Sequence, residues 1–307
     1  LPICSSSVRF RVDGTLREVV QPNKALHAAL ISRLKIMAEL DIAERRLPQD
    51  GRIKTRVKGR ELDLRVSTVP TVHGESVVMR VLDRASVRFS LESMGFAADT
   101  LERFNALLAR PHGILLVTGP TGSGKSTTLY SALSVLNDKS RNIMTVEDPI
   151  EYYMEGVGQT QVNTKVEMTF ARGLRAILRQ DPDVIMIGEM RDEETARIAI
   201  EASLTGHLVL STVHANNVFD VIGRFTHMDV DPYSFVSALT GVLAQRLVRV
   251  NCVHCSDIVS VTEAALRESL IDPVRVEGRV LRASHGCGKC RGTGFKGRKA
   301  VGELLIL

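Results

Sequence analysis

The stretch Gly113-Ile-Leu-Leu-Val-Thr-Gly-Pro-Thr-Gly-Ser-Gly-Lys-Ser-Thr127 joins a short apolar run to a glycine-rich loop. The run Ile114–Thr118 predicts a buried strand, and the residues after the loop predict a helix. A loop of this kind turns successive backbone N–H groups toward one point, where the helix N-terminus adds positive partial charge. The stretch therefore predicts a phosphate-binding loop of Gly119, Pro120, Thr121, Gly122, Ser123, Gly124, Lys125, Ser126 and Thr127.

Two side chains of this loop have distinct expected roles. Lys125 can reach the β- and γ-phosphates of a nucleotide as a mobile point charge. The Ser126 hydroxyl is placed to bind Mg²⁺. We therefore expect ATP and Mg²⁺ as ligands, and nucleotide hydrolysis as the reaction.

Acidic residues follow two further strand-like runs, whose ends should lie beside the phosphate loop in a parallel sheet. Glu189 comes after Val184–Ile187, and we interpret it as the carboxylate on the metal side. Three acids within Glu147–Glu151 follow Ile143–Val146, and one of them should face the γ-phosphate. The alternative is that these acids are only solvated or cap helices.

Two histidines flank the fourth strand-like run, Leu208–Thr212. His207 precedes this run, and His214 follows it. Either imidazole can sense the γ-phosphate, whereas the alternative is a hydrogen-bonded structural histidine.

Short apolar runs alternate with helical patterns beyond residue 110, which is typical of a parallel sheet covered by helices. The four strand-like runs are residues 114–118, 143–146, 184–187 and 208–212. We therefore expect an α/β nucleotide-binding domain over residues 111–307.

A small α+β domain is expected over residues 1–90. Val8–Val12 alternates apolar and polar residues and meets a turn signal at Asp13-Gly14. A helix with Leu26, Leu30, Leu34 and Met37 on one face should follow, and then three strands at 52–57, 61–67 and 76–82. The polar segment 83–90 is a predicted linker, and residues 91–110 are a predicted docking helix.

The composition is that of a globular protein with two domains or one domain and a subdomain, at 307 residues and 44% hydrophobic content. Zero tryptophan and 4% aromatic residues argue against a base-stacking surface. The net charge of +5 comes from scattered arginines, so a solvated surface is favoured over direct nucleic-acid binding. No apolar run is long enough to span a bilayer, so we expect no transmembrane segment and membrane association only through partners.

Four of the five cysteines form two Cys-x-x-Cys pairs, Cys252 with Cys255 and Cys287 with Cys290. This spacing favours a metal over disulfides, and four thiolates suit structural Zn²⁺ with no open position for a substrate. The predicted zinc subdomain is 252–290. Cys4 stands apart as an expected free thiol, so the compartment is expected to be reducing.

With these motifs in order, the chain resembles the secretion and type IV pilus ATPase superfamily, most closely the type II secretion ATPases. The resemblance covers nearly the whole chain and is most specific at residues 119–128, 145–151, 170–183 and 188–192. It implies a RecA-like P-loop domain with a mainly parallel sheet, preceded by a small PAS-like α+β domain and carrying a tetracysteine zinc subdomain.

The resemblance also implies residue roles. Glu151 matches the general base for water, Glu189 the atypical Walker B acid, and His207 and His214 the histidine box. Arginines around the triphosphate match Arg65, Arg80, Arg175 and Arg179. Domain closure can carry the first two to the γ-phosphate, and the last two, four residues apart, should share a helical face. The alternative for each arginine is an ordinary surface ion pair.

The function implied is that of a cytoplasmic homohexameric motor, peripheral to the inner membrane, which acts on inner-membrane secretion platform proteins to assemble a pseudopilus. The tetracysteine insert favours secretion or pilus assembly over pilus retraction. The alternatives are a type IV pilus assembly ATPase, a RecA-like nucleic-acid translocase, and a scaffold that binds ATP without turnover. Leu1–Ser7 stands where the family has an acidic-His motif, so we interpret the chain as a fragment.

Overall fold

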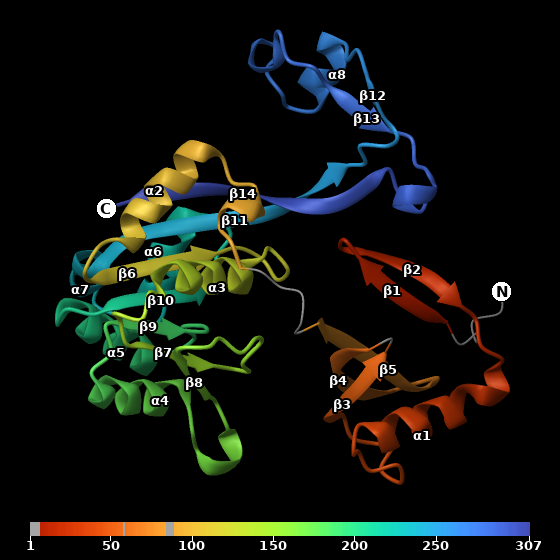
Figure 1. Ribbon diagram of the computed structural model, residues 1–307, viewed down its shortest axis with the longest axis horizontal. Helices are drawn as coiled ribbons and strands as arrows, with labels where there is room; N and C mark the ends of the chain where they lie inside the picture. The colour runs from red at the N-terminus through yellow and green to blue at the C-terminus, as the bar shows by residue number, and fades with distance from the viewer. Residues whose placement is uncertain (1–6, 58, 84–88) are drawn as a thin grey trace.

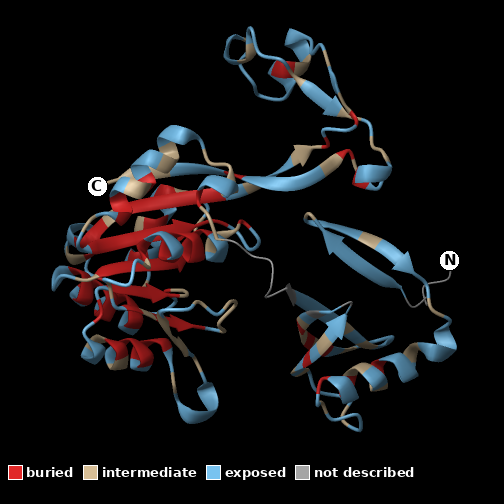
Figure 2. Cartoon of the chain, viewed as in Figure 1, coloured by how far each residue is buried: buried red, intermediate tan, exposed pale blue. Residues whose placement is uncertain are grey.

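The computed structural model describes residues 7–57, 59–83 and 89–307. Cys4, Lys58 and most of the predicted linker therefore lie outside the described residues. A large helix-covered sheet, a smaller domain beside it and a projecting lobe make up the chain (Figure 1). Buried residues are concentrated in the large sheet and its helices (Figure 2).

The large sheet has seven strands in the order β14-β11-β6-β10-β9-β7-β8. All neighbours are parallel except β11 and β14, which are antiparallel, so the predicted mainly parallel sheet is confirmed. The strands are β6 (Gly113–Thr118), β7 (Ile143–Glu147), β8 (Val157–Gln161), β9 (Val184–Ile187), β10 (Leu208–Val213), β11 (Leu239–Asn251) and β14 (Phe295–Ile306).

Helices cover both faces of this sheet, and β6 is accordingly buried at every position. Ile114 and Leu116 of β6 face one core cluster, and Leu115 and Val117 face the other. The first cluster holds α4 (Phe170–Ile177), α5 (Glu193–Leu204), α6 (Val218–Thr226) and α7 (Pro232–Ala238). The second holds α2 (Ala98–Leu108) and α3 (Lys125–Leu136).

The predicted docking segment 91–110 contains a 3₁₀ turn at Glu92–Met94 and then α2. Leu91, Phe104, Leu107 and Leu108 are buried against the sheet, and Leu101 packs beside them. The limits of the domains at residues 90 and 110 stay a prediction.

The small domain, here called the first domain, contains the strands and the helix that the sequence predicts between residues 8 and 82. Its elements are β1 (Val8–Val12), β2 (Thr15–Val20), α1 (His27–Met37), β3 (Gln49–Val57), β4 (Arg60–Thr71) and β5 (Gly74–Asp83). The expected apolar face of α1 is wrong in detail. Leu26, Leu30 and Met37 are exposed, whereas Ile31 and Lys35 are buried. Lys35 is tolerated there because its ammonium forms an ion pair with Glu75.

Strands β11 and β14 continue beyond the sheet as a two-stranded ribbon, which the sequence reading did not predict. The ribbon leads to a lobe with β12 (Ser256–Ile258), α8 (Glu263–Glu268) and β13 (Arg282–Ser284) (Figure 1). Across the described ranges, no helix combines the length and the apolar character needed to cross a bilayer.

Candidate nucleotide-binding site

The glycine-rich loop connects β6 to α3, as the sequence predicts. Gly119 has φ 140°, and a Cβ there would lie 2.4 Å from the backbone oxygen of Gln245. Gly124, the residue before α3, has φ 92°. Only glycine adopts this path at low cost, so the loop requires both residues.

Gln245 of β11 holds the loop from behind, and sequence reasoning missed it. Its side-chain amide donates to the Ser123 carbonyl at 2.7 Å and accepts from the Thr128 hydroxyl at 2.7 Å. The side chain is buried, so these hydrogen bonds are protected from water. Gln245 thus fixes the shape of the loop although it lies 122 residues beyond Ser123 in the sequence.

A cleft of about 1010 Å³ opens at the carboxyl ends of the parallel strands. Of the nine loop residues, six line it, namely Thr121, Gly122, Gly124, Lys125, Ser126 and Thr127. Gly119, Pro120 and Ser123 complete the loop behind them. The first domain also reaches the cleft, through Arg11, Asp13, Gly14 and Arg80.

Lys125 folds back onto its own loop. Its ammonium donates to the carbonyls of Gly119 at 2.8 Å and Pro120 at 3.2 Å. Partial burial lowers the pKa of Lys125; Glu189 opposes this shift and the positive charge of Arg246 adds to it. Desolvation of the ammonium makes an anion in the cleft a favourable partner.

Glu189 follows β9 and lies between two basic side chains. His214 Nε2 lies 3.1 Å from its Oε1, and Arg191 Nε donates to its Oε2 at 2.7 Å. All three residues line the cleft. The structure therefore brings Glu189 and His214 together. It also places Arg191 beside them, a residue for which the sequence predicted no role.

Glu151 follows β7 and contacts the first domain. Its Oε1 lies 3.5 Å from Arg65 Nη1 and 3.6 Å from Arg80 Nη1. Arg65 also donates to the Ile150 carbonyl at 3.0 Å. These arginines are paired across β4 and β5, so two neighbouring strands of the first domain meet the acid of the large sheet.

Three residues predicted for the site lie away from the cleft in this structure. His207 precedes β10 at the opposite edge of the sheet, where its Nδ1 lies 2.8 Å from the Ala202 carbonyl oxygen. Arg175 forms an ion pair with Glu194 at 2.7 Å. Arg179 lies in a 3₁₀ turn beyond α4, so the two arginines do not share one α-helical face.

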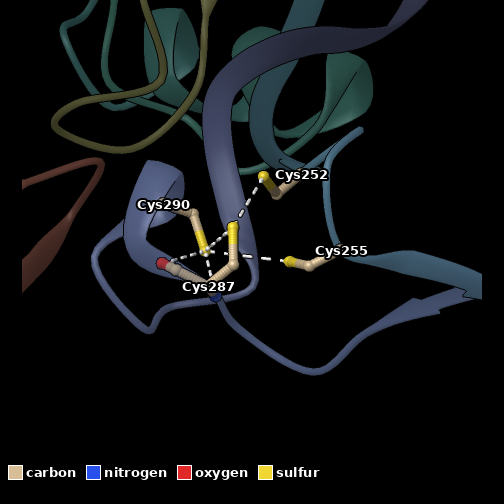
Figure 3. A group of neighbouring side chains, drawn as sticks. All are labelled: Cys252, Cys255, Cys287 and Cys290. Atoms are coloured by element: carbon tan, nitrogen blue, oxygen red, sulfur yellow. Dashed lines mark hydrogen bonds between the residues drawn. The ribbon is translucent and has the colours of Figure 1, made fainter.

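The four paired cysteines converge in the projecting lobe, and their side chains point toward one another (Figure 3). Their sulfur atoms all lie within 4.8 Å of one another. The Sγ atoms of Cys252 and Cys287 are 4.0 Å apart, and those of Cys255 and Cys290 are 3.8 Å apart. These distances are close to the about 3.8 Å between two thiolate sulfurs bound to a tetrahedral Zn²⁺. Burial opposes thiolate formation at Cys290, but N–H groups of Cys287 and Gly294 donate to its sulfur and lower its pKa. The donor set fits Zn²⁺.

A protein-family model described as Type II/IV secretion system protein matches residues 4–307. The chain belongs to this family. It is 56% identical over 299 residues to the type II secretion system protein E of Pseudomonas aeruginosa, covering 97% of this chain and 59% of that protein. It is 55% identical over 301 residues to the type II secretion system ATPase E of Vibrio cholerae, covering 98% and 59%. The chain therefore spans about three fifths of these relatives.

Two solved structures share the fold. The crystal structure of the pilus retraction motor PilT with bound ADP has a TM-score of 0.59 and 28% identity, covering 98% of this chain and 76% of that one. The Legionella pneumophila ATPase DotB has a TM-score of 0.68 at 21% identity, covering 99% and 75%. The second likeness supports the fold alone.

Proposed function

We propose that this chain is the ATP-hydrolysing part of a type II secretion motor. The observation that carries the proposal is the convergence of a phosphate-binding loop, Glu189 and Glu151 on one cleft. The names of the similar proteins support it, because one is a type II secretion ATPase and another is a pilus motor with bound ADP.

In the proposed reaction, N–H groups of the loop and the Lys125 ammonium bind the β- and γ-phosphates. Ser126 and Glu189 are the residues that would hold Mg²⁺, which would neutralise phosphate charge when bound. Glu151 is the general base that accepts a proton from the attacking water. His214 and Arg191 hold the Glu189 carboxylate from two sides.

The arginines of the first domain link substrate binding to this base. In the structure, Arg65 and Arg80 pair with Glu151. A triphosphate in the cleft competes for both guanidinium groups because it carries more negative charge than one carboxylate. Entry of ATP thereby frees Glu151 to receive a proton and moves two cations onto the phosphate. Contacts of Arg175, Arg179 and His207 with nucleotide stay predictions.

The wider assembly is part of the same proposal. We place the motor in the cytoplasm at the inner membrane, as a homohexamer that acts on platform proteins of the secretion system. The four cysteines would hold Zn²⁺ with no open position, so the metal would be structural. Co-purification with a pseudopilus platform, rather than with pilus assembly proteins, tests this assignment against the type IV pilus alternative.

The deciding experiment replaces the proposed base. Glu151→Gln in the assembled protein should lower kcat for Mg²⁺-ATP by about 10²- to 10⁴-fold, since the amide cannot accept the proton. Nucleotide affinity, measured with a fluorescent ATP analogue, should be retained.

The matched control is Glu155→Gln. Glu155 lies four residues after Glu151, is exposed and does not line the cleft. This variant should hydrolyse ATP at the normal rate. A Glu151→Gln protein with unchanged turnover would exclude Glu151 as the base.

A further inference from the structure

A buried tyrosine connects the phosphate loop to the loop that carries Glu151. Tyr130 lies in α3, the helix that begins at Lys125, and it is 1% exposed. Its hydroxyl donates to Oε2 of Glu147, the last residue of β7. The proposed function uses neither side chain, although Tyr130 is among the largest fully buried side chains of the described chain.

Glu147 is a buried carboxylate surrounded by donors. Besides Tyr130, its Oε1 accepts from the Thr145 hydroxyl at 2.6 Å and from the Gln159 amide at 3.0 Å. Burial of a carboxylate is unfavourable unless such hydrogen bonds satisfy it, so its presence indicates a requirement beyond packing. The groups that it gathers come from α3, β7 and β8.

The same network continues into the acidic loop, defined here as residues 148–154. The Tyr130 oxygen accepts from the backbone N–H groups of Glu151 and Tyr152, each at 3.3 Å. Gln159 donates to the Tyr152 carbonyl at 2.9 Å and accepts from the Met154 N–H at 2.8 Å. The acidic loop is thus fixed on both sides of Tyr152.

Aromatic contacts support the same geometry. The Phe89 ring stacks on the Tyr130 ring with 5.1 Å between the ring centroids. The Tyr152 ring meets the Tyr130 ring edge-on, with 5.6 Å between the centroids. Burial and the Glu147 charge raise the pKa of Tyr130 above its ordinary range. The hydroxyl therefore stays protonated and keeps donating to Glu147 throughout the working pH range.

We propose that Tyr130 and Glu147 are positioning residues that hold Glu151 in register with the phosphate loop. The Tyr130 hydroxyl donates toward β7 and accepts from the base-bearing loop, so a single oxygen fixes the distance between α3 and Glu151. The inference rests on the proposed role of Glu151. It adds that nucleotide binding at the head of α3 is transmitted to the base through this hydroxyl.

The test is Tyr130→Phe, which removes the hydroxyl and keeps the ring. We expect kcat for Mg²⁺-ATP to fall by about 10- to 100-fold through misplacement of the base, with nucleotide affinity within about twofold of normal. The matched control is Tyr233→Phe, because Tyr233 is exposed on α7 and should leave kcat unchanged. If Tyr130→Phe folds poorly, Glu147→Gln provides the same test, because it retains the shape of the side chain. It should lower kcat by a similar factor.

A double variant separates this inference from the proposed function. If Tyr130 acts through Glu151, adding Tyr130→Phe to Glu151→Gln should lower kcat no further. A folded Tyr130→Phe protein with normal kcat, beside an inactive Glu151→Gln protein, would overturn the positioning role alone. Full activity of Glu151→Gln would overturn the proposed base instead.

Discussion

The two walls of the cleft differ in how firmly the chain holds them. On the sheet side, each functional loop follows a strand buried along nearly its whole length, between two layers of helices. On the other side, the hydrophobic cluster found among the described residues of the first domain has three buried members, Ala38, Ile53 and Val66, and every residue of β1 is exposed. The sheet is a fixed platform, whereas the first domain is lightly built.

The contacts between the two walls are mainly electrostatic. Arg65 and Arg80 meet Glu151, and Asp13 of the β1–β2 turn lies 3.8 Å from Arg298 of β14. Partly exposed ion pairs of this kind contribute little to stability. The first domain is therefore held against the sheet by weak contacts, whereas a packed core holds the phosphate loop, Glu189 and Glu151.

Among the changes that test this comparison, the largest expected effect comes from removing an arginine of the first domain. Arg65→Ala should lower kcat by about 10²- to 10³-fold, because a guanidinium at the γ-phosphate stabilises charge in the transition state. Arg80→Ala should cost less, since Arg80 is the more exposed of the two. Steady-state phosphate release by the assembled protein measures both.

Arg56→Ala is the control for these variants. Arg56 lies in the same domain and pairs with Glu61 at the surface, away from the cleft. Its loss should leave turnover unchanged. If Arg65→Ala and Arg80→Ala both retain full activity, neither arginine supplies a cation to the reaction.

A smaller effect should distinguish the two edges of the sheet. His214→Ala removes a partner of Glu189 and should reduce kcat about 10-fold, as loss of an outer-sphere partner does at metal sites.

His207→Ala should instead keep turnover within about twofold and lower Tm by about 2–4 °C, the equivalent of one hydrogen bond of about 1 kcal/mol. Phosphate release and differential scanning fluorimetry report the two outcomes. Equal losses of kcat for both histidines would contradict the division between the edges.

The smallest effect on turnover is expected from the projecting lobe, which belongs to neither wall. Removing Zn²⁺ with a chelator should unfold residues 252–290 locally and expose their arginines to trypsin, while ATP hydrolysis by the intact sheet stays within about twofold. Added Zn²⁺ should restore protection. Trypsin resistance that survives chelation would show that the lobe needs no metal.

The sequence could predict whatever depends on neighbouring residues. The loop at residues 119–127, the strand-end acids and the cysteine pairs are local patterns, and parallel strands bring their carboxyl ends to one edge by necessity. Gln245 was missed because its partners lie 117 and 122 residues away, and no local pattern marks it.

Helix α1 shows the limit of periodicity. Its leucines follow a helical spacing, but the first domain buries Ile31 and Lys35 instead, since the Lys35 ammonium finds a carboxylate on β5. The Tyr130 network likewise depends on three elements meeting in space, so its members look like ordinary core residues in the sequence.

Strand β11 connects the phosphate loop directly to the cysteine lobe. Gln245, which holds the phosphate loop, is its last buried residue. Beyond it, Arg246–Asn251 run for about 20 Å, paired with β14, and end at the first cysteine. The ribbon of β11 and β14 therefore forms an arm that connects the phosphate loop to the cysteine lobe. A rotation of β11 about Gln245 would displace the cysteine lobe further than the phosphate loop, because displacement grows with distance from the axis of rotation.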